Sequence, residues 1–178
     1  MMKAMLMLLL LLTLPSCTHV ISDRSRAMVD PSVTYLMLHQ NPEQFKGRYV
    51  LVGGAIASVT NRPEGGQLEV VQLPVDRQGM PEDTFNTGGR FLAVSDRFLD
   101  PLVFKEGKRV TIVGEVRGLR VKTLDQLDYR YPVIGIREVH VWRPEEVERQ
   151  NYPQPYPYYW HDPWWPSWYY RPGPFRPW

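Results

Sequence analysis

The sequence predicts a mainly β fold, a small five-stranded OB-like barrel with one short helix and an extended C-terminal tail rich in proline and aromatic residues. Three observations carry this prediction. Five runs of strand-forming residues lie within about a hundred residues, glycines interrupt them where a small sheet has to bend, and a single short segment has helical spacing. A β-sandwich is the alternative fold for the same strands.

The N-terminus predicts export and lipid attachment. Lys3 precedes an apolar run of about nine residues, which is too short for a membrane-spanning helix because such a helix needs roughly 20. Leu14, Pro15 and Ser16 then stand directly before Cys17, and this arrangement resembles the lipobox of bacterial lipoprotein signals. The resemblance implies cleavage before Cys17 and acylation of the cysteine with palmitate-type chains. An ordinary secretory signal with an incidental buried cysteine is the alternative.

The residues after the cysteine predict where the chain is held. Thr18 occupies the position at which aspartate retains such lipoproteins in the inner membrane, so the resemblance implies a lipid anchor on the periplasmic face of the outer membrane. Residues 18–31 are polar and unpatterned, and we expect a structureless tether that lifts the domain off the lipid. Because Cys17 is the single cysteine, no intramolecular disulfide and no cysteine-based metal cluster can form.

One short helix is predicted before the strands. Apolar residues recur at helical spacing over residues 32–41, and Pro42 disfavours its continuation. Proline is tolerated in a first turn, so a second turn is expected over residues 42–46 with Asn41 as its cap. His39 has no partner nearby in sequence, and we interpret it as a partly exposed helix residue.

The strands are predicted over residues 48–59, 66–73, 90–95, 109–121 and 132–142. In the first, Gly53 and Gly54 break the middle and indicate a bulge or bend, since no phosphate-binding glycine motif surrounds them. Residues 75–87 form a long polar loop of the kind that often carries function. Tyr129 and Tyr131 are assigned to a polar connection before the last strand.

Five sequence pieces occur in the order found in a known family. They are residues 41–56, 88–93, 98–101, 107–114 and 131–133. Together they resemble the Slp family of outer-membrane lipoproteins, the starvation-inducible lipoproteins. The resemblance implies a location at the inner face of the outer membrane and a stress response, with no established catalysis, cofactor or ligand.

Within the matched part, Gly88, Gly89, Arg90 and Asp100 are the candidate ligand-binding or structural residues. A glycine pair lets the backbone approach another group closely, and Arg90 can bind a carboxylate or phosphate with its guanidinium fork. A structural pair between Arg90 and Asp100 explains the same residues, so both interpretations stay open. No catalytic triad, HExxH motif or P-loop is found, and no catalytic residue, metal site or cofactor is predicted.

The whole chain is expected to divide into a signal peptide (1–16), a lipidated tether (17–31), the barrel domain (32–150) and the tail (151–178). Proline and aromatic residues dominate the tail, which we expect to be disordered or in polyproline II conformation, with contact to a membrane interface or an envelope polymer as the alternative.

The predicted function is that of an outer-membrane lipoprotein with a structural, interaction or stress-related role and no catalysis. The alternative is a periplasmic binding module for a small ligand or envelope polymer that uses loop 75–90 or the tail. An envelope protein or polymer is the expected partner besides membrane lipid. A nucleic-acid partner is disfavoured, because residues 18–150 carry 18 basic and 18 acidic side chains and offer no net positive charge.

Overall fold

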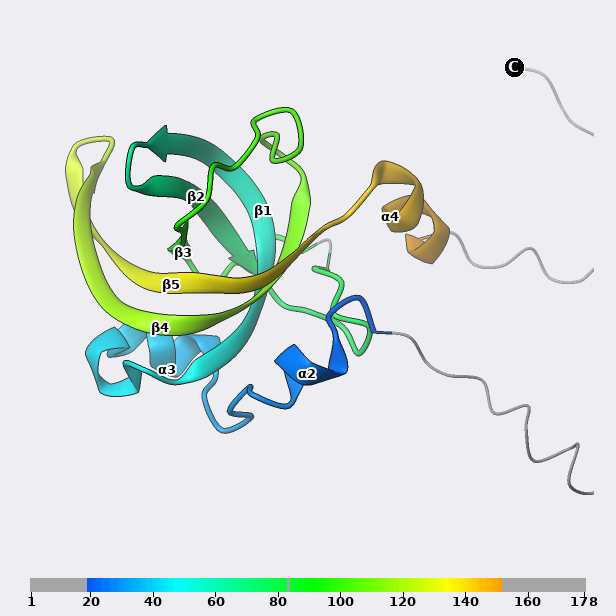
Figure 1. Cartoon of the computed structure of the whole chain (residues 1–178), viewed down its shortest axis with the longest axis horizontal. Helices are drawn as coiled ribbons and strands as arrows, with labels where there is room; N and C mark the ends of the chain where they lie inside the picture. The colour runs from blue at the N-terminus through cyan, green and yellow to red at the C-terminus, as the bar shows by residue number, and fades with distance from the viewer. Residues whose placement is uncertain (1–18, 83, 152–178) are drawn as a thin grey trace, which may run out of the picture. The chain divides into compact units, whose positions relative to one another are not determined.

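The structure is a computed structural model that describes residues 19–82 and 84–151. Its first unit ends at Arg143 and contains a closed barrel of five strands (Figure 1). The strands are β1 (Tyr49–Arg62), β2 (Gly65–Leu73), β3 (Arg90–Ser95), β4 (Arg109–Leu124) and β5 (Leu127–Val141). Around the barrel they follow the order β1-β2-β3-β5-β4, and β4 pairs with β1 to close it. These pairs are antiparallel except for β3 with β5. The predicted mainly β, OB-like fold is confirmed.

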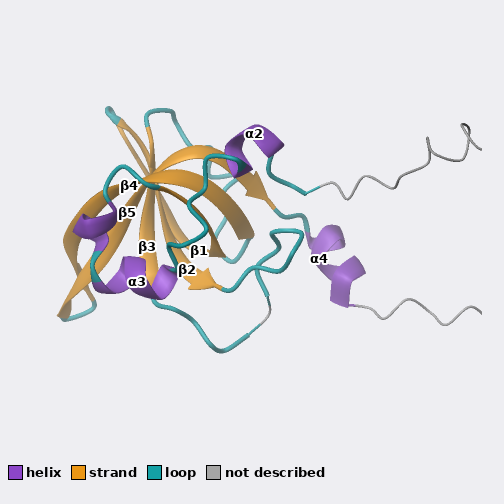
Figure 2. Cartoon of the chain, turned by 90° about the horizontal axis from the view of Figure 1, so that it is seen from below, coloured by secondary structure: helices purple, strands orange, loops and turns teal. Residues whose placement is uncertain are grey.

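Apolar side chains on alternate strand positions fill the barrel. The cluster comprises Leu38, Phe45, Val50, Val52, Ile56, Leu68, Val70, Phe91, Ala93, Leu99, Val110, Ile112, Val116 and Ile134. Its first two members come from outside the sheet, from helix α3 (Tyr35–Gln40) and the 3-10 helix η1 (Pro42–Phe45). Figure 2 shows α3 beside the strands that it covers. The predicted helix is therefore confirmed, and its role is to bury apolar surface of the barrel.

The two helices differ in how they begin. The Thr34 side chain accepts a hydrogen bond from the Met37 N–H at 3.4 Å and so caps α3, because the first turn of a helix leaves its N–H groups unpaired. Asn41 was expected to cap the next turn, but its side chain makes no capping hydrogen bond there. Pro42 explains the difference, since it begins η1 with a residue that has no N–H to satisfy.

The glycine pair of β1 does not interrupt the strand as predicted. β1 runs through Gly53 and Gly54 and pairs there with β2 on one side and β4 on the other. A Cβ atom on Gly54 would collide with the Val71 carbonyl oxygen and lie 2.7 Å from the Val70 side chain. The register shift lies further along, between Ile56 and Ser58. Close packing between strands therefore requires the glycine, and the bulge follows it.

The last strand begins earlier than predicted. β5 starts at Leu127, and Tyr129 and Tyr131 belong to its ladder with β4 instead of a polar connection. The two strands meet in a hairpin whose turn holds Asp125 at a positive φ of 53°. Side chains near the hairpin tip are mostly exposed, as at Leu127 and Val121. Because neither face of this hairpin is buried, its residues do not alternate between apolar and polar, and the sequence gives no strand pattern there.

The segment after residue 18 is packed, which corrects the expectation of a structureless tether. It contains helix α2 (Asp23–Arg26), and Ile21 is 1% exposed. Val29 forms a parallel bridge with Tyr49 at the start of β1. A polar sequence concealed this packing because a single buried isoleucine carries no periodic pattern.

The outer side of β4 carries a second layer. Thr111 and Val113 are fully buried, although the alternation assigns them to the outward face. The Thr111 hydroxyl donates to the Gly79 carbonyl and accepts from the Trp142 indole N–H at 2.9 Å. Loop residues between β2 and β3 and the residue that follows β5, Trp142, thus cover this part of the strand.

A second unit begins at Pro144 and contains helix α4 (Pro144–Asn151), which has two glutamates in its first turn. Cys17 and residues 152–178 lie outside the described residues. In the part of the chain that the structure describes, no helix combines the length and apolar character needed to cross a membrane.

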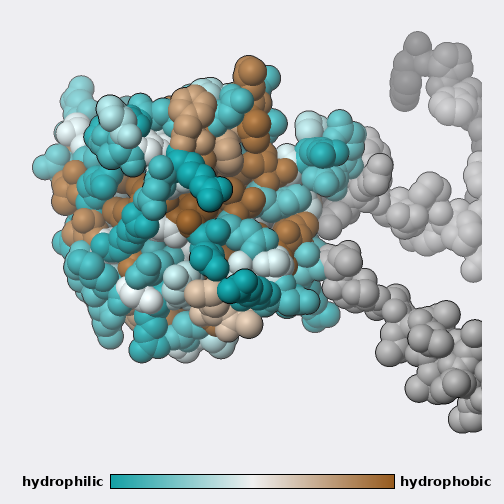
Figure 3. All heavy atoms as spheres, viewed as in Figure 1, coloured by the Kyte–Doolittle hydropathy of each residue, from teal (hydrophilic) through white to brown (hydrophobic). Residues whose placement is uncertain are grey.

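Figure 3 shows apolar side chains gathered near the loop that follows β3, where Phe98, Leu102 and Val103 are exposed.

Candidate binding groove

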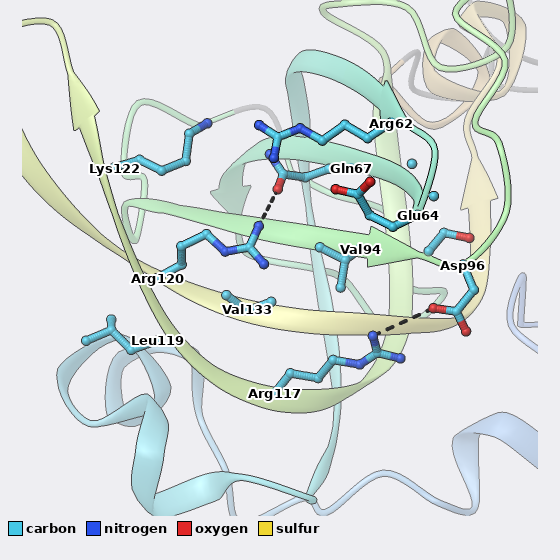
Figure 4. A pocket seen from close by; sticks show the side chains of 13 residues that line it. Arg62, Glu64, Gln67, Val94, Asp96, Arg117, Leu119, Arg120, Lys122 and Val133 are labelled. Carbon is cyan, nitrogen blue, oxygen red and sulfur yellow. Dashed lines mark hydrogen bonds and ion pairs between the residues drawn. The ribbon is translucent and has the colours of Figure 1, made fainter.

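A groove of about 660 Å³ opens on the outer face of the barrel beside the β1–β2 hairpin (Figure 4). Gln67 of β2, Val94 of β3 and Val133 of β5 lie along its floor. The register explains the floor, because Gln67 pairs with Val94 and residues paired across a ladder point to the same face. The floor therefore combines apolar surface with one amide.

The walls of the groove are mainly basic. Its charged side chains are Arg62, Glu64, Asp96, Arg117, Arg120 and Lys122. Four cations thus face two carboxylates within one hollow, although the chain around them is balanced in charge. We refer to this site as the basic groove. Close-set cations of this kind attract carboxylate or phosphate groups.

Two arginines of β4 are held in position across the groove. Arg120 donates from Nη1 to Oε1 of Gln67 at 2.7 Å. The Arg117 guanidinium lies over Gly135, where a Cβ atom would collide with it, and its Nη1 is 3.8 Å from Oδ1 of Asp96. That ion pair is exposed and weak. Since a guanidinium has five N–H donors, most of them remain available to a ligand.

A hydrogen-bonded network on the same sheet contains the predicted residue Arg90. Its Nη1 donates to Oε1 of Glu69 at 2.7 Å, and the Tyr131 hydroxyl donates to the same oxygen at 3.1 Å. Lys122 of the basic groove lies 4.0 Å from Oε2 of Glu69 and 5.8 Å from the centre of the Tyr131 ring. Burial, and to a smaller extent the negative charge of Glu69, raises the pKa of Tyr131 to about 12. The tyrosine therefore stays a neutral donor at physiological pH.

The predicted pair Gly88 and Gly89 packs against side chains of the protein itself. Gly88 donates its N–H to Oε1 of Gln72 at 2.9 Å. Gly89 has a φ of +105°, and a Cβ atom there would lie 2.5 Å from the Tyr129 hydroxyl. That hydroxyl accepts the Arg90 N–H at 2.8 Å and lies 3.1 Å from Nε2 of His39. The glycines thus admit a close approach of α3, β3 and the β4–β5 hairpin.

Asp100 lies apart from this network. Its Oδ1 accepts the Leu102 N–H at 2.8 Å and closes a turn after β3. The pair between Arg90 and Asp100, one of the interpretations left open by the sequence, does not form, because Glu69 is the carboxylate that the strand register brings to Arg90. None of the described residues of loop 75–90 lines the basic groove.

The residues of the basic groove were not singled out from the sequence. Arg62 belongs to one hairpin and Arg120 to another, so only the closed barrel brings them together. One signal was available, since Arg120 and Lys122 are two positions apart and share a face of a strand. Among the described residues, no group of three or more histidine, cysteine, aspartate or glutamate side chains is arranged to hold a metal ion.

The role of Arg90 is testable by substitution. Arg90→Ala is expected to lower the free energy of unfolding by about 1–2 kcal/mol, because it removes the nearest cation from the largely buried Glu69 carboxylate. Thermal and urea unfolding of the full chain measure the effect. Arg97→Ala, at an exposed arginine, is the control and should change stability by less than about 0.5 kcal/mol. An Arg90→Ala variant as stable as the control would contradict the structural role.

The model of the Outer membrane lipoprotein Slp family matches residues 14–172. The chain belongs to the Slp family. This Slp family member is 27% identical to the Outer membrane protein Slp of Escherichia coli strain K12, over 94% of this chain and 91% of that protein. It is also 27% identical to the Uncharacterized lipoprotein YeaY of the same strain, over 93% and 88%. The predicted family is confirmed, and membrane-lipid anchoring follows from membership in a lipoprotein family.

Solved structures similar to this Slp family member include single-stranded DNA-binding proteins. The small single-stranded DNA-binding protein of Streptomyces coelicolor matches with a TM-score of 0.35 and 14% identity, over 52% of this chain and 92% of that one. Pot1pC of Schizosaccharomyces pombe bound to single-stranded DNA matches with a TM-score of 0.32 and 13% identity, over 59% and 86%. Likenesses at this level carry no argument about the ligand of the Slp family member.

Proposed function

We propose that acyl chains on Cys17 anchor this lipoprotein to the periplasmic face of the outer membrane, where it acts as a non-catalytic binding module in a structural or stress-related role. The lipobox before Cys17 and the family of outer membrane lipoproteins support the anchor. The same proposal treats residues 1–16 as a signal peptide and residues 151–178 as a C-terminal tail. The barrel supplies the binding surface.

The basic groove is the observation that carries the binding role. Its arginines present donors that suit carboxylates and phosphates, while Val94 and Val133 offer an apolar floor on which a sugar ring can rest. An anionic glycan or another anionic envelope polymer satisfies both features. The binding surface is thus proposed at the basic groove, in place of loop 75–90.

The side chains of the groove also support a role without catalysis. Arg62, Arg117 and Arg120 each present a fork of N–H donors and no acceptor, which suits the binding of an anion. Asp96 is exposed and lies beside one of these cations. This set fixes an anionic ligand in place, which is the property that a binding module requires.

A double substitution in the basic groove tests the binding role. In the full-length lipidated protein in detergent micelles, Arg62→Gln with Arg120→Gln is expected to weaken polyanion binding about tenfold, because two charge-assisted contacts are lost. Isothermal titration calorimetry at low ionic strength with polygalacturonate and with inorganic polyphosphate separates carboxylate from phosphate preference.

The control carries the same change of charge at exposed sites outside the groove, Lys46→Gln with Lys105→Gln. It should bind within about twofold of the unaltered protein, since only long-range attraction is reduced. Equal weakening in both double variants, or no binding of either polymer by the unaltered protein, would contradict the proposed groove function.

A further inference from the structure

The first described residue is already packed on the barrel. The His19 ring lies against Gly79 so closely that a Cβ atom on the glycine would be 2.6 Å from Cε1 of the imidazole. Nδ1 of His19 accepts the Ile21 N–H at 3.0 Å, and Ile21 is 1% exposed. Burial and the neighbouring Arg26 charge lower the pKa of His19. The chain is thus held to the barrel from its first described residue.

Hydrogen bonds hold the next residues to β5. The Ser22 N–H and hydroxyl donate to the two carboxylate oxygens of Glu138 at 2.9 Å and 2.6 Å. Although partial burial acts in the opposite direction, these bonds and one from Ser25 lower the pKa of Glu138. The carboxylate therefore stays ionised at physiological pH and keeps these hydrogen bonds, so α2 starts from a fixed position.

We propose that the end of the barrel that holds His19 and α2 lies directly against the lipid headgroups, without an intervening tether. The inference rests on the proposed acylation of Cys17. Only Thr18 separates Cys17 from the packed His19, and two residues span at most about 7 Å. Since the acyl chains hold Cys17 at the headgroups, they hold His19 within that reach too.

The surface that meets the headgroups is formed by His19, the loop tip at residues 76–79 and helix α2. Its exposed arginines, Arg24, Arg26 and Arg77, suit the phosphate of lipid headgroups. Asp23 and Asp76 lie in the same segments, so the net attraction is small. The acyl chains supply the binding energy, and the short connection determines which face of the barrel they bring to the membrane.

This attachment turns the basic groove away from the lipid. Thr111 lies at the attached end of β4, since its hydroxyl donates to the Gly79 carbonyl. Arg120 is nine positions further along the same strand, and at about 3.3 Å per residue this corresponds to roughly 30 Å along the curved strand. Figure 1 shows the start of the described chain and the β4–β5 hairpin on opposite sides of the barrel. The groove is thereby presented to ligands in the aqueous space.

Site-specific labels test the orientation in the full-length, lipidated protein. Acylated Cys17 is the single native cysteine, so Gln78→Cys and Leu127→Cys each introduce the only free thiol. Both side chains are exposed, one at the attached end and one at the β4–β5 hairpin. In phosphatidylcholine–phosphatidylglycerol vesicles with headgroup nitroxide lipids, a fluorophore at residue 78 should be quenched at least about threefold more than one at residue 127.

A linker variant is the matched control. Inserting about twenty glycine and serine residues between Thr18 and His19 should leave the protein in the membrane fraction and abolish the difference in quenching, because such a linker is a flexible coil. Equal quenching at residues 78 and 127 in acylated protein, or an unchanged difference with the linker, would overturn direct apposition while leaving the anchor intact. Protein that lacks acyl chains by mass and does not float with vesicles would overturn the anchor, and the apposition with it.

Discussion

Replacing Cys17 with serine is expected to move the protein from the membrane to the soluble or unprocessed fraction. Each buried CH₂ of an acyl chain contributes about 0.8 kcal/mol, and several chains together anchor a protein almost permanently. The apolar side chains of the core cluster are buried inside the barrel, so they are not available to the lipid. Membrane fractionation, vesicle flotation and the mass of the mature N-terminal peptide measure the loss.

The control for this experiment is Ser16→Ala, which keeps a small residue before the cysteine. The variant should be cleaved, acylated and membrane-bound like the unaltered protein. A Cys17→Ser protein that still floats with vesicles would show that acyl chains are not what holds the domain, and it would remove the basis for the orientation proposed above.

The second large effect is expected at Gly54. A methyl group there would collide with the Val71 carbonyl oxygen and press on Val70, and the backbone of β2 cannot move without breaking its pairs with β1. Gly54→Ala is therefore expected to lower the free energy of unfolding by about 3 kcal/mol, as overpacking of a filled core does. Urea unfolding followed by circular dichroism measures the change.

Gly107→Ala is the control, and it measures the cost of a positive φ alone, without the steric collision expected at Gly54. Gly107 has a φ of +80°, but an added Cβ atom would meet nothing within 4 Å. The cost should be only about 1 kcal/mol, which is the strain of holding alanine at a positive φ. If the two variants lose equal stability, close packing at Gly54 is not what requires the glycine.

Strand positions with alternating burial were predictable from the sequence. Residues 66–73 were predicted as a strand and β2 runs from Gly65 to Leu73, because alternating burial leaves a periodic trace. The start of β5 was missed, since the exposed hairpin around Leu127 has no buried face to mark it. The packed segment around Ile21 was missed because one buried residue makes no pattern.

By itself, the sequence determined the fold class, the family and the expectation of a lipid on Cys17, since these depend on residue type and spacing along the chain. Only the tertiary structure decided which side chains meet. Strand register places Val71 opposite Arg90 and so brings Glu69, one diagonal step away, to the arginine in place of Asp100. Barrel closure likewise gathers Arg62 and Arg120 in one groove of a charge-balanced chain, because proximity in a closed sheet does not follow distance in sequence.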